Sequence, residues 1–160
     1  MKSMTQSSKI FAINRRARFD YEISETMEAG IVLQGTEIKA MREGKANLSD
    51  AYARNMSGEI YLINAHIGQY SNATPGANHE PKRSRKLLLR KSQISKIVSQ
   101  LDEKGYTIVP IKIYLKKNVA KIELGVGKGK KLYDKRRSLI EKERNREAQK
   151  ALAYKQKELS

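Results

Sequence analysis

Side chains that could carry acid–base or metal chemistry are few in this sequence, and they are scattered. Cysteine is absent, so there is no thiol nucleophile and no thiolate metal site. The two histidines, His66 and His79, do not have the spacing of a metal-binding pair; we expect His66 to be structural and His79 to lie in a loop. Carboxylates such as Glu28, Glu37 and Asp50 lie far apart, and no pattern pairs them. We therefore expect no enzyme activity, no metal and no cofactor.

Basic side chains, in contrast, occur in clusters that suit phosphate. The first cluster puts Arg15, Arg16 and Arg18 between Asn14 and Phe19. Guanidinium groups bind phosphate oxygens in a bidentate manner and stack on bases, and an asparagine can pair with a base edge. The alternative is a solvated surface turn, and the net charge of the chain favours RNA contact.

Two further basic runs are less specific. Residues 82–86 (KRSRK) are either RNA-binding or a charged loop. Residues 125–131 (GVGKGKK) resemble a phosphate loop only superficially, because no serine or threonine follows Gly129-Lys130. We interpret this segment as a flexible hinge that leads into a basic tail.

The net charge indicates a polyanionic partner. The 160 residues include 33 Lys and Arg against 17 Asp and Glu, a formal charge of +16. Binding through such a charge releases counterions and is steeply salt-dependent. A membrane surface is disfavoured, since there is no Trp, only two Phe, and no apolar run near the roughly 18 residues needed to span a bilayer. The first residues lack the apolar core of a signal peptide, so we expect a cytoplasmic protein.

The hydrophobic pattern predicts a mainly β fold with α-helices. Alternation or short apolar runs indicate strands, and three- to four-residue spacing indicates helices. We expect strands near 19–24, 31–33, 59–64, 106–115 and 120–126, helices over 36–42 and 87–101, and a mobile loop at 71–84. Pro110 implies an edge strand or a bulge, and a turn at Lys117-Asn118 makes the last two strands a hairpin. This pattern suits a small antiparallel OB-fold β-barrel with about three helices.

Three regions follow from the composition. Residues 1–8 are polar and expected to be flexible, and residues 9–127 form the RNA-binding barrel. Residues 128–160 contain 12 basic and 5 acidic residues and only a thin apolar stripe. Such a tail cannot bury enough apolar surface to fold alone, although its Glu, Lys, Arg and Ala content favours helix once a partner supplies a surface.

Six motifs in unbroken order carry a family resemblance. They are residues 14–18 (NRRAR), 28–30 (EAG), 35–39 (GTEIK), 44–52 (GKANLSDAY), 85–89 (RKLLL) and 125–131 (GVGKGKK), the last followed by 134–136 (DKR). Over about residues 9–137 the chain resembles the SsrA-binding protein family, also called small protein B.

The resemblance implies a specific role. Members of this family are OB-fold proteins that bind the tRNA-like domain of transfer-messenger RNA (tmRNA) and carry it into the A site of stalled bacterial ribosomes, where the tail becomes helical in the decoding centre and mRNA channel. Elongation factor Tu is an expected partner in delivery, the protein is expected to be a monomer, and it performs no chemistry. The function left open beside this one is a structural ribosomal or ribosome-assembly protein.

The site residues follow from the resemblance and from the basic clusters. The family's RNA-binding surface falls on Asn14, Glu28, Leu88 and Lys121, although Leu88 could equally be core. The full expected RNA-binding set is Asn14, Arg15, Arg16, Arg18, Glu28, Lys39, Lys45, Arg85, Lys86, Leu88, Lys121 and Lys128. The expected ribosome-contacting tail residues are Lys130, Lys131, Tyr133, Asp134, Lys135 and Arg136. The family commonly has histidine where this chain has Tyr133, and a phenol ring can still stack on a base.

Overall fold

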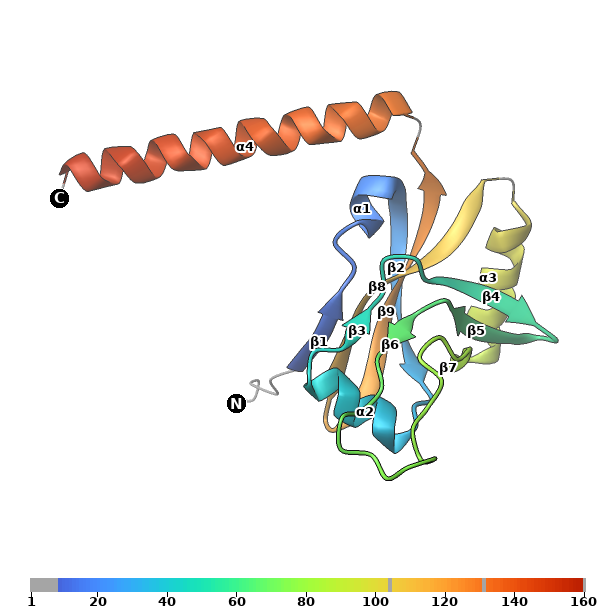
Figure 1. Ribbon diagram of the computed structural model, residues 1–160. Coiled ribbons are helices and arrows are strands. Elements are labelled where there is room, and N and C mark those ends of the chain that lie inside the picture. The colour runs from blue at the N-terminus through green and yellow to red at the C-terminus, as the bar shows by residue number, and fades with distance from the viewer. Residues whose placement is uncertain (1–8, 104, 131, 160) are drawn as a thin grey trace, which may run out of the picture. The chain divides into compact units, whose positions relative to one another are not determined.

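The computed structural model describes residues 9–103, 105–130 and 132–159 (Figure 1). The predicted flexible segment 1–8 lies outside these residues. The strands are β1 (Lys9–Ile13), β2 (Tyr21–Ile31), β3 (Ala46–Asn47), β4 (Tyr52–Met56), β5 (Glu59–Ile63), β6 (His66–Ile67), β7 (Arg85–Leu88), β8 (Tyr106–Lys116) and β9 (Val119–Gly129). The helices are α1 (Ala17–Asp20), α2 (Gly35–Arg42), α3 (Lys91–Asp102) and α4 (Leu132–Leu159).

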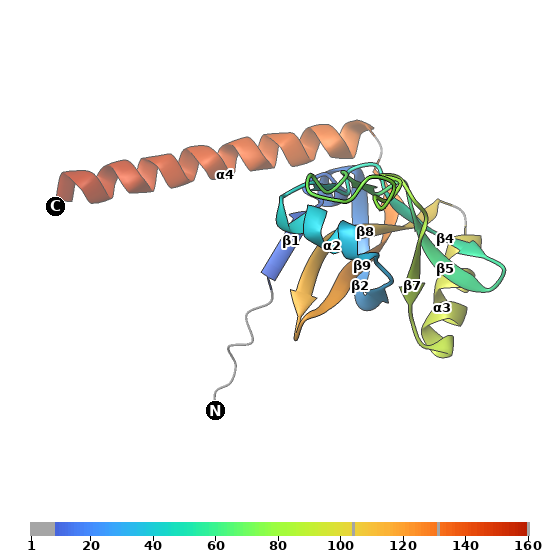
Figure 2. The ribbon, with the colours of Figure 1, turned by 60° about the horizontal axis from the view of Figure 1, so that its bottom comes forward.

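The β8–β9 hairpin is the longest pairing of the sheet, and the other strands complete a closed ring between its two strands. Its two-residue turn is Lys117-Asn118, whose φ angles of 52° and 62° match the twist of a tight hairpin. β9 also pairs with β2, and the order then continues through β7, β5 and β4. β4 returns to β8 at Ala53 and Ile108, which closes the ring, and β1 pairs with Lys112–Leu115 farther along the same edge of β8 (Figures 1 and 2). The predicted mainly β fold with helices is confirmed.

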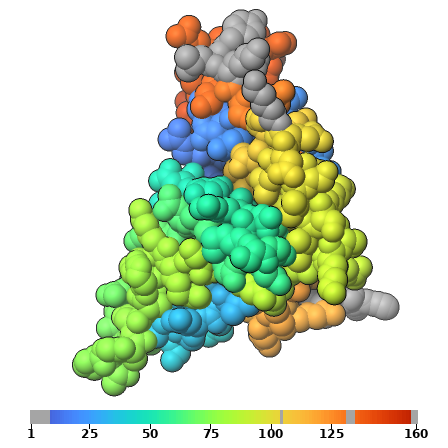
Figure 3. All heavy atoms as spheres, turned by 90° about the vertical axis from the view of Figure 1, so that its right-hand side faces the viewer, coloured from blue at the N-terminus to red at the C-terminus, as the bar shows by residue number. Residues whose placement is uncertain are grey.

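The core lies inside this ring. Alternate residues of β9, namely Ile122, Leu124 and Val126, are buried, while the side chains of Lys121 and Glu123 on either side of Ile122 face outward. Ile97 of α3 is fully buried against the same cluster. Figure 3 shows α3 (yellow) beside the β4–β5 hairpin (teal) on one face. The predicted bulge at Pro110 is confirmed by a register shift between Pro110 and Lys112.

Two element predictions were wrong. The segments 19–24 and 31–33 do not belong to two strands; β2 runs without interruption from Tyr21 to Ile31, with a bulge after Ile23. The helix expected over 87–101 begins only at Lys91, because β7 occupies the preceding residues and Arg90 has an extended backbone. The apolar residues at the end of β7 and those of α3 happen to follow one another at three- to four-residue spacing, so together they look like one helix.

The segment 71–84 has no regular structure, as expected, but side-chain hydrogen bonds connect it to the rest of the fold. His79 is buried; its Nδ1 is 2.9 Å from Thr36 Oγ1 and its Nε2 is 2.8 Å from the Ile67 carbonyl. The side chain of Asn78 bonds both the backbone N–H and the carbonyl of Tyr70. His79 lies in the loop, as expected, but is buried there and structural, whereas His66, which was expected to be structural, is exposed.

A buried ion pair ties α2 to β7. The guanidinium of Arg85 is fully buried and donates to Glu37 Oε2, to the Ala65 carbonyl (2.8 Å) and to the Pro81 carbonyl (3.1 Å). Arg83 donates to the other oxygen of Glu37. Burial alone would raise the pKa of Glu37, but hydrogen bonds from Arg83, the Gln34 backbone and Arg85 lower it, so the carboxylate is ionised.

The chain divides into two compact units, Met1–Gly129 and Lys130–Ser160. β9 continues to Gly129, two residues past the boundary expected from the sequence. Within the second unit α4 is a single helix of 28 residues, whose described side chains are almost all exposed. The described residues contain no helix long and apolar enough to cross a membrane.

We expect Arg85→Met to destabilise the fold strongly. Removal of one partner of a buried ion pair leaves the other charge uncompensated, at a cost of roughly 3–5 kcal/mol in the free energy of unfolding. Urea denaturation of the full chain measures this change. Lys86→Met is the matched control, because Lys86 pairs with Glu59 at the surface (3.7 Å) and should cost roughly 0–1 kcal/mol. Equal losses for the two variants would contradict a special role for the buried pair.

Candidate RNA-binding surface

Charged side chains gather on the outer face of β2, β9 and β8. Glu28 lies opposite Glu123, and Lys121 lies opposite both Gly30 and Tyr114. The ring of Tyr114 is nearly buried on this face, and its hydroxyl donates a hydrogen bond to Glu28 Oε2. Lys116 lies 3.6 Å from the same carboxylate oxygen. The pairing of three long strands thus holds one carboxylate among cations and a phenol.

This environment keeps Glu28 ionised. The Tyr114 hydrogen bond lowers the pKa of Glu28, partial burial opposes that shift, and the charges of Lys116 and Lys121 lower the pKa further. Burial and the bond to Glu28 raise the pKa of Tyr114, so the phenol remains a donor. Glu28 is therefore a fixed acceptor, suited to base N–H donors and unfavourable to phosphate.

A groove adjoins this face. It has a volume of about 520 Å³, and it is lined by Glu28, Gly30, Leu88, Leu89, Arg90, Gln93 and Lys121. Leu88 is 53% exposed and lies across Gly30, where an added Cβ would come within 3.0 Å of Leu88 Cβ. Leu88 is thus at the surface, and the alternative that it belongs to the core was wrong. The structure brings together three of the four family positions: Glu28, Leu88 and Lys121.

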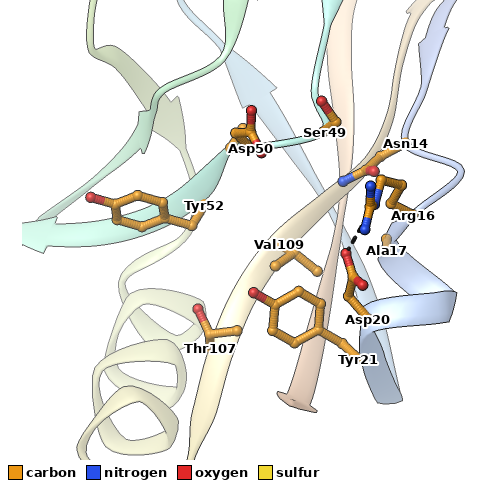
Figure 4. A pocket seen from close by; sticks show the side chains of 11 residues that line it. Asn14, Arg16, Ala17, Asp20, Tyr21, Ser49, Asp50, Tyr52, Thr107 and Val109 are labelled. Atoms are coloured by element: carbon orange, nitrogen blue, oxygen red, sulfur yellow. Dashed lines mark hydrogen bonds and ion pairs between the residues drawn. The ribbon is translucent and has the colours of Figure 1, made fainter. Parts of the chain in front are cut away.

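The fourth family position, Asn14, lies elsewhere. It follows β1 and lines a separate pocket of about 380 Å³ that shares no residue with the groove (Figure 4). Its side-chain amide donates to the carbonyls of Leu48 (3.3 Å) and Pro110 (2.9 Å). The amide nitrogen is therefore committed to the fold and is not available to a base edge.

The other predicted RNA-binding cations divide into exposed and buried ones. Arg85 is wrong as an RNA contact, because its buried guanidinium binds Glu37 and two carbonyls. The predicted cations that are exposed or partly exposed are Arg15, Arg16, Arg18, Lys39, Lys45, Lys86 and Lys128. Several of them already have partners. Arg16 Nε lies 3.4 Å from Asp20, Lys39 and Lys128 lie over the rings of Tyr70 and Tyr106, and Lys45 donates to the Gln69 carbonyl.

The predicted tail residues are only partly described. Lys130 donates to Ser138 Oγ (3.0 Å), and Lys135 and Arg136 lie on α4. Lys131 and the side chains of Tyr133 and Asp134 lie outside the described residues.

Sequence reasoning missed Arg90, Gln93 and Tyr114. Arg90 and Gln93 line the groove because β7 ends at Leu88 and α3 begins at Lys91. Sequence analysis predicted one helix over 87–101 and therefore no junction between a strand and a helix at this place. Tyr114 alternates with the buried Ile113, which could have indicated an outward ring, but only the register of three strands brings it to Glu28. Among the described residues no group of three or more His, Asp or Glu could hold a metal ion.

The fold and these surfaces define a class, that of small basic β proteins whose polar faces suit a polyanion. The chain belongs to the SmpB family, because the model of the family described as SmpB protein matches residues 11–154. It is 54% identical over 147 residues to the SsrA-binding protein of Halalkalibacterium halodurans, with 92% of this chain and 95% of that protein covered. It is 49% identical over 152 residues to the SsrA-binding protein of Trichormus variabilis, with coverages of 95% and 98%.

A solved structure is also similar. Its description reads "tmRNA-SmpB: a journey to the center of the bacterial ribosome", and the matching chain is 47% identical with a TM-score of 0.64. The match covers 76% of this chain and 85% of that one. The two chains therefore share a fold over most of their length.

We expect Tyr114→Phe to raise the pKa of Glu28 toward its ordinary value, because the largest cause that lowers it is removed. A carboxylate with a depressed pKa stabilises the fold above its unfolded pKa, and this contribution is lost as the pH falls through its folded pKa. The acid-sensitive part of the stability should therefore shrink in the variant. Carboxyl ¹³C titration between about pH 2 and about pH 6 covers the range of such groups.

Glu25 provides an internal control in the same spectra. Its pKa is lowered chiefly by Lys96, far from Tyr114, and should not change in the variant. A shift of Glu25 as large as that of Glu28 would indicate general loosening of the fold and contradict the specific hydrogen bond.

Proposed function

We propose that this protein is an RNA-binding adaptor of trans-translation. The ring of strands binds the tRNA-like domain of tmRNA and delivers it to the A site of stalled ribosomes, which allows peptide tagging and ribosome rescue. The observation that carries the proposal is the convergence of Glu28, Leu88 and Lys121 around one groove, in a chain whose relatives bear the name SsrA-binding protein.

The groove has the three kinds of surface that a folded RNA loop needs. Leu88 offers an apolar patch for a base or ribose face, Glu28 accepts N–H donors, and Lys121 neutralises phosphate. Because the carboxylate repels phosphate, it favours RNAs that present a base at that point. Such a mixed site reads the shape of a folded RNA better than a uniformly basic patch does.

The tail serves a second partner. Residues 130–160 contain 11 basic and 5 acidic residues, and the apolar side chains Leu139, Ile140, Leu152 and Tyr154 are exposed. Helical residues with so little apolar surface gain stability from a surface that carries phosphate, which the decoding centre and mRNA channel would supply. Disorder of the free tail, and stacking by Tyr133, belong to this proposal. We also propose that the protein is a non-enzymatic, cytoplasmic monomer and that it is delivered to the ribosome together with elongation factor Tu.

A structural ribosomal or ribosome-assembly protein is the second candidate, favoured by the basic extension itself. Sedimentation of cell extracts separates the two. A stoichiometric component of every ribosomal subunit fits the second candidate, whereas sub-stoichiometric enrichment on stalled ribosomes fits the adaptor.

We expect the protein to bind the tRNA-like domain of tmRNA far more tightly than unrelated RNA hairpins. Filter binding at about 0.2 M salt measures this, because non-specific electrostatic binding is weak there. Lys121→Ala should weaken binding and lower the salt slope by about one phosphate contact. Arg54→Ala, a change of an exposed cation that lines neither the groove nor the pocket, is the matched control and should leave the slope unchanged. Equal affinity for all the hairpins would refute the proposed function.

Removal of residues 130–160 should separate the two partners. The ring, its core and the groove all lie within residues 9–129, so RNA affinity should stay within about threefold, whereas tagging on stalled ribosomes should be abolished. Filter binding and an in vitro tagging assay measure the two outcomes. Loss of RNA affinity together with tagging would contradict the division of labour between ring and tail.

A further inference from the structure

A third concave surface, which we call the β1–β3 cleft, adjoins two short strands that are neighbours in the fold (Figure 1). The cleft has a volume of about 490 Å³. Four consecutive residues of β1 (10–13) line it, together with Arg15 and three consecutive residues (46–48) that include β3. None of these residues lines the groove around Glu28, so the cleft is a site of its own.

The edges of the two strands, rather than their faces, border the cleft. Side chains alternate between the faces of a strand, so a surface formed by one face would contain every second residue and not four in a row. Within the described residues β1 pairs with β8 alone and β3 with β6 alone, which leaves each with an edge that no strand covers. The Asn14 N–H donates to the Ile111 carbonyl on β8 (2.7 Å). Because successive residues of an antiparallel strand direct their backbone groups to opposite edges, those of Ile13 point away from β8.

A bulge turns two exposed isoleucines to the same face of β1. The register against β8 shifts after Ile10, which lies opposite Tyr114, and Ile13 lies opposite Lys112. Lys112 and Tyr114 are two residues apart and share a face of β8, so Ile10 and Ile13 share a face of β1. The two isoleucines are 46% and 51% exposed, whereas Ala12 packs against the core. Charged residues usually prevent pairing at a sheet edge, and two exposed β-branched side chains favour it.

The charge of the cleft indicates what it binds. Arg15 in the lining and Lys9 at the start of β1 are both exposed, and the described lining residues include no carboxylate. An occupant with acidic side chains is therefore favoured. A second copy of this chain is disfavoured, because it would bring the same two cations and a net charge of +16.

We propose that the β1–β3 cleft binds an extended, acidic segment of a partner protein, which adds a strand to the free edge of β1. Backbone hydrogen bonds supply affinity, alternate apolar side chains cover Ile10 and Ile13, and carboxylates pair with the cations at the cleft. RNA fits this surface less well, because its backbone has no N–H and C=O groups at strand spacing and an isoleucine offers no ring for stacking. The interaction is additional to the proposed RNA binding and does not depend on it.

The test is a titration of the full-length ¹⁵N-labelled protein with synthetic peptides, each to about 1 mM, which suits weak binding by a short peptide. The first peptide alternates valine with glutamate, the second alternates valine with lysine, and the third is the acidic peptide with every backbone N–H methylated. The acidic peptide should shift the backbone signals of Ile13 and Asn47 and slow hydrogen exchange of the Ile13 amide. It should also bind about tenfold more tightly than either of the others.

Other occupants give different results. Equal affinity of the acidic and basic peptides would refute charge complementarity, and equal affinity of the methylated peptide would refute strand addition. Shifts at Ile13 and Asn47 with single-stranded oligouridylate, but not with the acidic peptide, would assign the cleft to RNA. The same shifts on concentration of the protein alone would assign it to a second copy, and tighter peptide binding after removal of residues 1–8 would assign it to that segment. Each of these results overturns the inference.

Matched variants make the test specific to the cleft. Ile13→Ser removes a half-exposed apolar contact and should weaken binding of the acidic peptide about tenfold. Val32→Ser, a change of a side chain that is 44% exposed and outside the lining, should have no effect. Arg15→Glu should abolish the preference for the acidic over the basic peptide, whereas Arg54→Glu, at an exposed position outside the lining, should preserve it. Wild-type affinities in both cleft variants would refute the docking site.

Discussion

The buried ion pair between Glu37 and Arg85 is the interaction on which the site depends. It joins the start of α2 to the start of β7, and the same guanidinium also binds the Ala65 and Pro81 carbonyls. A buried charge is costly to desolvate, so it stabilises a fold only when its donors are satisfied, as these are. Because Arg85 is fixed, β7 pairs with β2 in a single register, and Leu88 three residues later lies across Gly30. The groove is therefore a consequence of a contact at the opposite end of a four-residue strand.

The arrangement of strands also explains why the four residues to which the family resemblance points occupy two separate surfaces. Glu28 and Lys121 lie on neighbouring strands and meet by register, whereas Asn14 follows β1 and lies against β8 through Pro110 and Ile111. A folded RNA that contacts both surfaces would be held at two points of a rigid ring. Contact at two points fixes the orientation of a bound molecule.

The sequence predicted what local physics determines. Alternation in 106–126 identified a hairpin, and the turn at Lys117-Asn118 follows from residue type. The family resemblance pointed to Glu28, Leu88 and Lys121, and the structure places all three around one groove, which no periodicity in the sequence could show. The prediction for Arg85 failed because a basic run looks the same whether its arginines face solvent or a buried carboxylate 48 residues away. The hydrogen bonds of the Asn14 amide were equally invisible, since they depend on carbonyls that only the folded chain brings near.

The carboxylates explain how so basic a protein can still select its RNA. Uniform positive charge attracts every polyanion and distinguishes none of them. In this fold an ionised Glu28 lies beside Lys116 and Lys121, and Asp50 lies at a pocket close to exposed arginines. Each carboxylate weakens contact with a bare phosphate backbone, and an RNA that places a base donor at that position recovers the loss. The cations therefore attract any polyanion, while the acceptors among them disfavour a bare phosphate backbone and favour a base donor.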